Sequence, residues 1–191
     1  MHQMPLLEAG VALVGHPTAR IDYRPQVCDA ATADAWFEAL LAQVPWRSDR
    51  RLMYERDVAV PRLLAHYALA DAGVPAAIRA AHAAVARVVP APFTSVGLNL
   101  YRDGGDSVAM HHDRLAELVP GEPIALLSLG ATRRMTIATR ATPRTTCRID
   151  LERGSVLVMN HASQLHYLHG IPKTKAPVGP RISLAFRVRP A

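Results

Sequence analysis

Two side chains that can bind a metal stand two positions apart in SVAMHHD, the imidazole of His111 and the carboxylate of Asp113. In a β-strand, residues i and i+2 project to the same face, so both can point into one site while His112 points away. Two imidazoles and one carboxylate form the facial triad of non-haem Fe(II) sites, which leaves positions open for substrate and oxygen. A structural zinc site would instead use four closed ligands, usually with thiolates. The pair therefore predicts oxygen chemistry if a second histidine joins it.

The second histidine has three candidates, His161, His166 and His169, in MNHASQLHYLHGIP. These three could also form a site of their own, because an irregular segment after the strand-like run SVLVMN could bring them together. The residue types alone leave both arrangements open. One is a triad completed from a distant strand across a barrel, and the other is a separate histidine cluster.

Two arginines follow in RISLAFR, where Arg181, Ser183 and Arg187 alternate with apolar residues and so share one face of a strand. A guanidinium presents a planar fork that matches a carboxylate and keeps its proton. An arginine beyond a metal-binding histidine therefore suggests a bound dicarboxylate. The alternative is that both arginines are solvated charges on an edge strand. Their spacing from the metal-binding residues favours the binding role.

The elements that must position these residues begin with two helices. Thr32 is the expected N-cap of a helix over residues 33–44, and a second helix starts at Pro75 and continues to Val89. Between them, the proline in VAVPRLLAHY predicts an extended or loop segment rather than a central strand.

From Ser95 onward the chain consists of short strand-like runs separated by turn residues. These runs are SVGLNLY, SVAMHH, IALLSLG, RRMTIATR, TCRIDL, SVLVMN and RISLAFRVR. Helices followed by many short strands predict an α+β domain with a jelly-roll or barrel core. We expect a single domain over residues 1–191, with residues 1–92 as an N-terminal extension and residues 93–191 as the catalytic core.

Composition limits the class of protein. Half of the 191 residues are hydrophobic, a fifth are charged, and no apolar run is long enough to cross a bilayer. Two cysteines and no basic leader with a cleavage site favour a cytoplasmic protein without a disulfide framework. The net charge is +6, and Lys173 and Lys175 are the only lysines among 22 basic residues. This excess suits a phosphate-rich partner, although coding bias explains the arginine content equally well.

Four motifs taken together resemble the AlkB family of Fe(II)- and 2-oxoglutarate-dependent nucleic-acid dealkylases. They are NLY at 99–101, HHD at 111–113, MNHASQLHYLHGIP at 159–172 and RISLAFR at 181–187. The similarity is greatest to the subgroup that contains the human DNA-repair members. It implies a double-stranded β-helix (jelly-roll) core with N-terminal helices and a nucleotide-recognition lip.

The resemblance also implies the roles of individual residues. His169 joins His111 and Asp113 as the third iron ligand, which leaves His161 and His166 to other roles. The remaining implied contacts are those to 2-oxoglutarate: Arg181 and Tyr101 hold its distal carboxylate, Asn99 and Arg187 contact the end near the metal, and Ser183 stands where relatives often have Asn. The expected reactants are thus Fe(II), 2-oxoglutarate and O2.

The implied substrate is alkylated DNA or RNA, with the base flipped out of the duplex or already single-stranded. VAVPRLLAHY resembles the recognition lip, with Arg62 near a phosphate and Tyr67 near the base or backbone, and His166 corresponds to a stacking histidine. Five arginines between residues 133 and 148 could follow a nucleic-acid backbone or form a solvated face. We expect a monomer with no obligate protein partner and no membrane association.

Leu115 departs from the family pattern, which often has an acidic residue two positions after the metal-binding Asp. That acid meets the exocyclic amine of the base, and reading an amine requires a hydrogen-bond acceptor. Two other functions therefore stay open. One is a 2-oxoglutarate-dependent hydroxylase of a protein or small metabolite, and the other is a non-enzymatic barrel that binds nucleic acid through its arginines.

Overall fold

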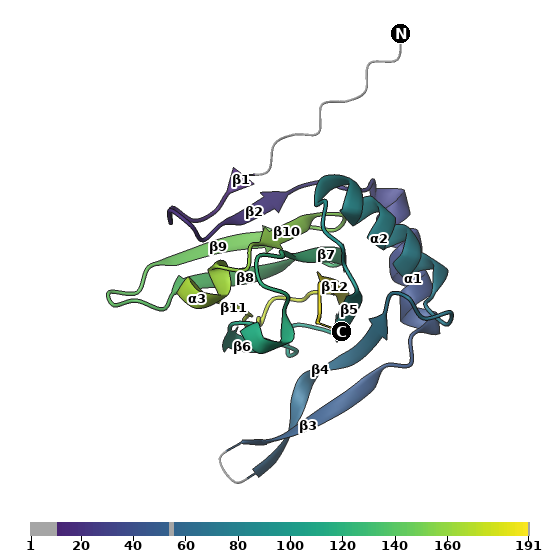
Figure 1. Ribbon diagram of the computed structural model, residues 1–191. Coiled ribbons are helices and arrows are strands. Elements are labelled where there is room, and N and C mark those ends of the chain that lie inside the picture. Colours follow the sequence, from purple (N-terminus) through teal and green to yellow (C-terminus); the bar gives the residue numbers. More distant parts are fainter. Residues whose placement is uncertain (1–10, 54–55, 191) are drawn as a thin grey trace.

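Antiparallel strands make up most of the described chain, which comprises residues 11–53 and 56–190 of the computed structural model (Figure 1). The larger of two sheets consists, in spatial order, of β1 Val11–Ala12, β2 Ile21–Arg24, β10 Val156–Met159, β7 Ile124–Gly130, β12 Arg181–Arg187, β5 Ser95–Tyr101, β4 Arg56–Ala68 and β3 Arg47–Met53. The smaller sheet consists of β6 Val108–His111, β11 Tyr167–Ile171, β8 Arg133–Thr139 and β9 Thr146–Leu151. Together they form the double-stranded β-helix that was expected.

Apolar side chains from both sheets fill the space between them. Leu126 and Leu157 of the larger sheet belong to the same buried cluster as Met135 and Ile137 of the smaller one. A second buried cluster lies on the opposite face of the larger sheet, against the helices. The larger sheet is therefore buried on both faces, and polar groups between the sheets are shielded from water.

Two helices cover the outer face of the larger sheet, α1 Ala30–Gln43 and α2 Ala76–Val88 (Figure 1). Both helices were predicted, but the predicted cap of α1 is wrong. The N-cap is Asp29, whose carboxylate accepts a hydrogen bond from the backbone N–H of Thr32 at 2.7 Å. Because a side chain at this position satisfies a free N–H of the first turn, the helix begins earlier than the sequence suggests.

Most of the strands predicted from Ser95 onward are present in the structure. β5, β7 and β9 have the predicted bounds, and β12 is a central strand between β7 and β5. Arg181 on β12 is 1% exposed, so a solvated edge position for this arginine is wrong. The segment expected to be irregular contains α3 Ser163–His166 and then β11, which pairs with both β6 and β8.

The segment around Pro61 is extended, which is one of the two predicted forms, but the prediction that it is not a central strand is wrong. β4 is a long strand that pairs with β3 on one side and β5 on the other. Its pairing with β3 is irregular between Ser48 and Arg50, opposite the segment that contains Pro61. A bulge of this kind is where a strand accommodates a residue without an N–H.

Strands from the first 92 residues complete the larger sheet, since β2 pairs with β10 and β4 pairs with β5. They are therefore part of the sandwich rather than an extension attached to it. The β3–β4 hairpin projects beyond the body of the sandwich in Figure 1. No helix in the part of the chain that the structure describes is long and apolar enough to cross a bilayer.

Candidate metal centre and substrate cleft

Three possible metal ligands meet at the edge of the smaller sheet. The ligand atoms of His111, Asp113 and His169 all lie within 4.8 Å of one another. His111 and His169 are direct partners on the neighbouring strands β6 and β11, and their ring centroids are 4.4 Å apart. The third ligand therefore comes from the adjacent strand and not from across the barrel.

Asp113 reaches the group from outside the strand, because β6 ends at His111. The turn that follows keeps the carboxylate close to His111, with Oδ1 4.0 Å from Nε2 of that histidine. His112 takes no part in this group, and its Nδ1 donates to the Asp113 carbonyl at 2.9 Å. The two-residue spacing thus predicts the right pair, although a turn rather than strand alternation brings it together.

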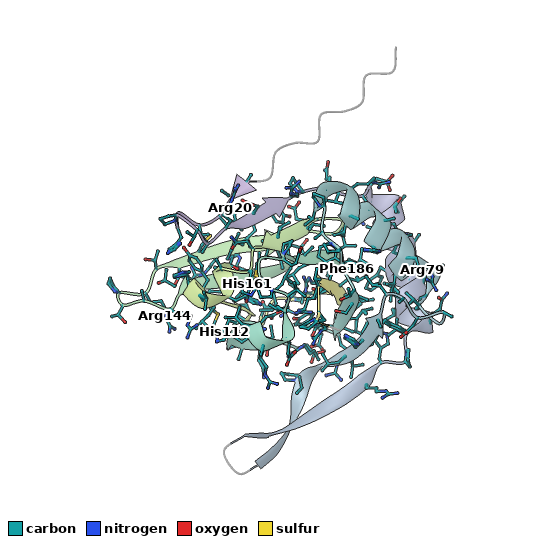
Figure 2. The ribbon with its side chains drawn as sticks, viewed as in Figure 1. Arg20, Arg79, His112, Arg144, His161 and Phe186 are labelled. Atoms are coloured by element: carbon teal, nitrogen blue, oxygen red, sulfur yellow. The ribbon has the colours of Figure 1, made fainter. Side chains whose placement is uncertain are left out.

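The competing histidine cluster does not form in the described chain. His166 ends α3, where its ring lies 4.0 Å from that of His16 between centroids. His161, labelled in Figure 2, is likewise absent from the ligand group. His169 is therefore the histidine of this segment that faces Asp113.

Hydrogen bonding and burial prepare the two histidines for metal binding. His111 Nδ1 lies 2.9 Å from the Ala109 carbonyl, which can only accept, so Nδ1 is the donor and Nε2 is the nitrogen directed to the ligand group. Burial, with the neighbouring His111, lowers the pKa of His169 to about 3. Both imidazoles are thus suited to donate a lone pair to a divalent cation.

The carboxylate of Asp113 is held ionised by an arginine. Burial raises its pKa, but the charge and hydrogen bond of Arg187, with smaller contributions from His169 and His111, lower it further than burial raises it. Arg187 Nε donates to Asp113 Oδ2 at 2.6 Å. A set of two imidazoles and one carboxylate with open positions fits Fe(II).

A buried glutamine fixes the backbone of the same residue, Asp113. Gln164 on α3 is 1% exposed, and its Oε1 accepts the backbone N–H of Asp113 at 2.9 Å. Its amide nitrogen donates to Ser163 Oγ at 3.1 Å. Sequence reasoning did not identify Gln164, because the residue is far from Asp113 along the chain and has no motif of its own.

The expected co-substrate residues line neighbouring strands. In the pairing of β5 with β12, Tyr101 lies opposite Arg181 and Asn99 opposite Ser183. Arg181 Nη2 donates to Ser128 Oγ at 2.8 Å, while its buried Nε has no hydrogen-bond partner in the described structure. A buried guanidinium with an unused donor fits the distal carboxylate of 2-oxoglutarate.

Two arginines assigned to nucleic acid have structural contacts as well. Arg62 Nε donates to Asn99 Oδ1 at 2.7 Å, so this side chain reaches toward the co-substrate residues. Arg133 is 3% exposed and donates to the carbonyls of Asp103, Asp106 and Pro172. A residue so enclosed cannot follow a nucleic-acid backbone.

A cleft of about 1300 Å³ opens onto the metal-binding residues between β4 and the segment after β6. Arg62 and Tyr67, two of the three predicted substrate residues, are among the residues that line it. Tyr67 pairs with Val96 of β5 and also packs against the helix-side cluster, whereas His166 is not among the cleft residues. His66 on β4 and Glu117 after β6 also line the cleft. Sequence reasoning missed both.

A double-stranded β-helix with this triad beside a buried arginine defines a non-haem iron oxygenase. The model of the 2OG-Fe(II) oxygenase superfamily matches residues 21–187, and the chain belongs to that superfamily. Fe(II) and 2-oxoglutarate, which the motifs predict, are accordingly its cofactor and co-substrate.

The similarity to AlkB proteins is also confirmed. The chain is 36% identical to the DNA oxidative demethylase ALKBH2 of Homo sapiens over 110 residues, which are 54% of this chain and 42% of that relative. It is 29% identical to the alpha-ketoglutarate-dependent dioxygenase alkB homolog 3 of Bos taurus over 199 residues, which are 88% of this chain and 66% of the relative. The chain thus spans less than half of the length of the first relative.

A solved structure shares the fold. It is an oxidoreductase of the 2OG-Fe(II) oxygenase family from Burkholderia pseudomallei, with a TM-score of 0.61 and 13% sequence identity. The match covers 90% of this chain and 87% of that structure.

Proposed function

We propose that this oxygenase removes alkyl groups from nucleic-acid bases. The observation that carries the proposal is the cleft, which ends at the metal-binding residues and has a basic lining. That lining includes the side chains of Arg47, Arg62, Arg114, Lys173, Arg187 and Arg189. Cationic side chains around an open cleft suit the phosphates of a strand that delivers a base to the metal.

The proposed reaction consumes one O2 and one 2-oxoglutarate for each methyl group. The triad would hold the iron that supplies the oxidation, in which one oxygen atom of O2 would enter succinate, released with CO2, and the other would enter the methyl C–H bond. The resulting N–CH2OH group loses formaldehyde, which returns the nitrogen to its unmodified state. No protein nucleophile is required.

The side chains of this chain bind and position the reactants. His111, Asp113 and His169 hold the metal, and Arg187 keeps the carboxylate ionised and oriented. Arg181 takes the distal carboxylate of the co-substrate in a site closed to water, where a charge-assisted hydrogen bond is strong. A base reaches the cleft only when it is unstacked from its neighbours.

Incubation with Fe(II), 2-oxoglutarate and single-stranded oligonucleotides that carry methylated or etheno bases tests the proposal. Loss of the lesion in step with succinate formation supports it, and a His111→Ala variant must lose both. Succinate formed with a protein or small-metabolite acceptor, but not with any lesion, would indicate the hydroxylase instead. DNA binding without any turnover would indicate a non-enzymatic barrel.

A further inference from the structure

Arg133 is a buried arginine that joins three parts of the chain next to the co-substrate residues. It is the first residue of β8 and is 3% exposed. Its Nη1 donates to the Asp103 carbonyl, and its Nη2 donates to the carbonyls of Asp106 and Pro172, all at 2.9 Å. The first two acceptors belong to the loop between β5 and β6, and the third directly follows β11. One guanidinium therefore links β8 to two loops that are distant from it in the sequence.

Both loops continue from strands that carry residues of the site. The loop at 102–107 follows Tyr101, the last residue of β5, and the other loop follows β11, which carries His169. The loops are also bonded to each other, because the Thr174 N–H donates to the Gly104 carbonyl at 2.9 Å. They pack so closely that an added Cβ at Gly104 would collide with the backbone of Thr174. Arg133 thus belongs to a tightly packed junction beside Tyr101.

Tyr101 lies close to two guanidiniums. Cζ of Arg133 is 5.6 Å, and Cζ of Arg181 is 5.3 Å, from the centroid of the Tyr101 ring, and this tyrosine is 3% exposed. A cation within about 6 Å of an aromatic ring is attracted to its face, more strongly where water is excluded. Because the three carbonyls fix the guanidinium of Arg133, this contact also restrains the ring of Tyr101.

The two guanidiniums bring more positive charge into the fold than the neighbouring side chains neutralise. Among the described residues, no carboxylate forms an ion pair with Arg133 or Arg181, and the carboxylate of Asp106 bonds to Arg102 at 2.8 Å. Burial lowers the pKa of Arg181 most, Tyr101 opposes this change, and the charge of Arg133 adds to it. A buried cation without a counter-ion is unfavourable, so this part of the fold favours a bound anion.

We propose that Arg133 is a positioning residue for 2-oxoglutarate. It holds Tyr101 and the loop after it in the arrangement in which Tyr101 and Arg181 receive the distal carboxylate, and its charge strengthens the attraction for that carboxylate. Arg133 acts through Tyr101 and through its charge rather than by contact with the co-substrate. The inference depends on the co-substrate of the superfamily and is independent of the proposed nucleic-acid substrate.

The test compares the affinity of the Mn(II)-bound protein for two 2-oxo acids by isothermal titration calorimetry. 2-Oxoglutarate and 2-oxopentanoate share the end that chelates a metal, but only 2-oxoglutarate has a distal carboxylate. We expect Arg133→Met to raise the Kd for 2-oxoglutarate by about tenfold or more, because the attraction of a buried cation is lost. The Kd values for 2-oxopentanoate and for Mn(II) alone should change little. Arg134→Met is the matched control, since this next residue of β8 is exposed and paired with Asp150.

Arg133→Lys keeps the test informative if Arg133→Met does not fold. Lysine retains the charge but lacks the planar fork that reaches three carbonyls, so the Kd for 2-oxoglutarate should rise here too, by less than in Arg133→Met. Tyr101→Phe, alone and combined with Arg133→Lys, measures whether the two residues act together. We expect the double variant to lose less binding free energy than the sum of the two single losses.

The outcomes separate positioning from a purely structural role. A folded Arg133→Lys variant with the wild-type Kd for 2-oxoglutarate, an equal rise in Kd for both acids, or additive losses with Tyr101→Phe would overturn the proposal. A wild type that binds 2-oxoglutarate as expected but repairs no lesion removes the proposed function alone.

Discussion

Arg187 Nε and Asp113 Oδ2 form a hydrogen bond of 2.6 Å between side chains that are 18% and 10% exposed. This contact occupies one oxygen of the carboxylate, and the other oxygen faces His111. The arginine therefore does more than neutralise a buried charge. It determines which oxygen is presented to a metal, and the loss of a group that orients a ligand in this way typically lowers metal affinity by about 10- to 100-fold.

Replacement of Arg187 by Lys should weaken metal binding. The lysine keeps the positive charge but not the planar fork, so Asp113 loses its fixed orientation. We expect Mn(II) to bind about 10- to 100-fold more weakly, as measured by electron paramagnetic resonance of the free ion. Arg153→Lys, in a surface pair with Asp34, is the control. Equal affinity in the Arg187 variant and the wild type would show that the ion pair does not orient the carboxylate.

Gln164→Leu should also weaken metal binding, because Gln164 holds the backbone of Asp113. The substitution leaves the Asp113 N–H without its acceptor in a buried site, which costs about 1–3 kcal/mol. We expect weaker Mn(II) binding and a lower melting temperature, both relative to Gln43→Leu on the exposed end of α1. A variant with reduced stability but wild-type Mn(II) affinity would limit Gln164 to a structural role.

The sequence predicts His111, Asp113 and the pair of arginines on one strand face because local spacing determines them. Arg181 and Arg187 share a strand face, and the strand-like texture from Ser95 onward correctly predicts most of the core. His169 is the exception among the ligands. Its strand β11, with the sequence YLHGI, is short and does not alternate polar with apolar residues, so the family pattern rather than strand periodicity identifies it.

The substrate side of the cleft could not be predicted in the same way. Which residues of β4 face the cleft depends on its register with β5, and a shift of one residue exchanges the two faces. The proline in this segment argues against a central strand, so the sequence alone assigns no register, and His66, which lines the cleft as Tyr67 does, could not be identified. Glu117 was missed for a similar reason, because a 3₁₀ turn sets its direction.

Arg181→Met should abolish stabilisation of the protein by 2-oxoglutarate. A ligand that binds only the folded state raises the melting temperature as its concentration increases. The wild type should show this rise, and the variant, without the buried guanidinium that fits the distal carboxylate, should not. Differential scanning fluorimetry with Mn(II) at several 2-oxoglutarate concentrations measures it. An equal rise in the variant would place the distal carboxylate elsewhere.

Gly130→Ala should destabilise the fold through the backbone. Gly130 has φ +77, and an added Cβ would lie 2.5 Å from the Pro180 carbonyl oxygen and 2.7 Å from the ring of Phe37. We expect a loss of more than about 1 kcal/mol in the free energy of unfolding, measured in urea. Gly73→Ala is the control, because nothing lies within 4 Å of its added Cβ. Similar losses in both variants would contradict the steric explanation.

His82 should make the protein less stable in mild acid. Its ring stacks on Phe186 with centroids 5.7 Å apart, and burial lowers its pKa below the ordinary value of 6.5. As the pH falls through 6.5, the unfolded chain therefore binds this proton before the folded protein does, and the free energy of unfolding decreases. Above that pH the loss is absent.

The pH dependence of unfolding in urea, compared between the wild type and His82→Gln, isolates this contribution. We expect the free energy of unfolding to decrease less between pH 7.5 and 5.5 in the variant, even if the variant is less stable at both values because it loses packing on Phe186. Subtracting the decrease in the variant from the decrease in the wild type removes the contributions of other groups that both proteins share, including His66 and His169. The same decrease in both proteins would mean that the folded protein accommodates the charged ring of His82 without cost.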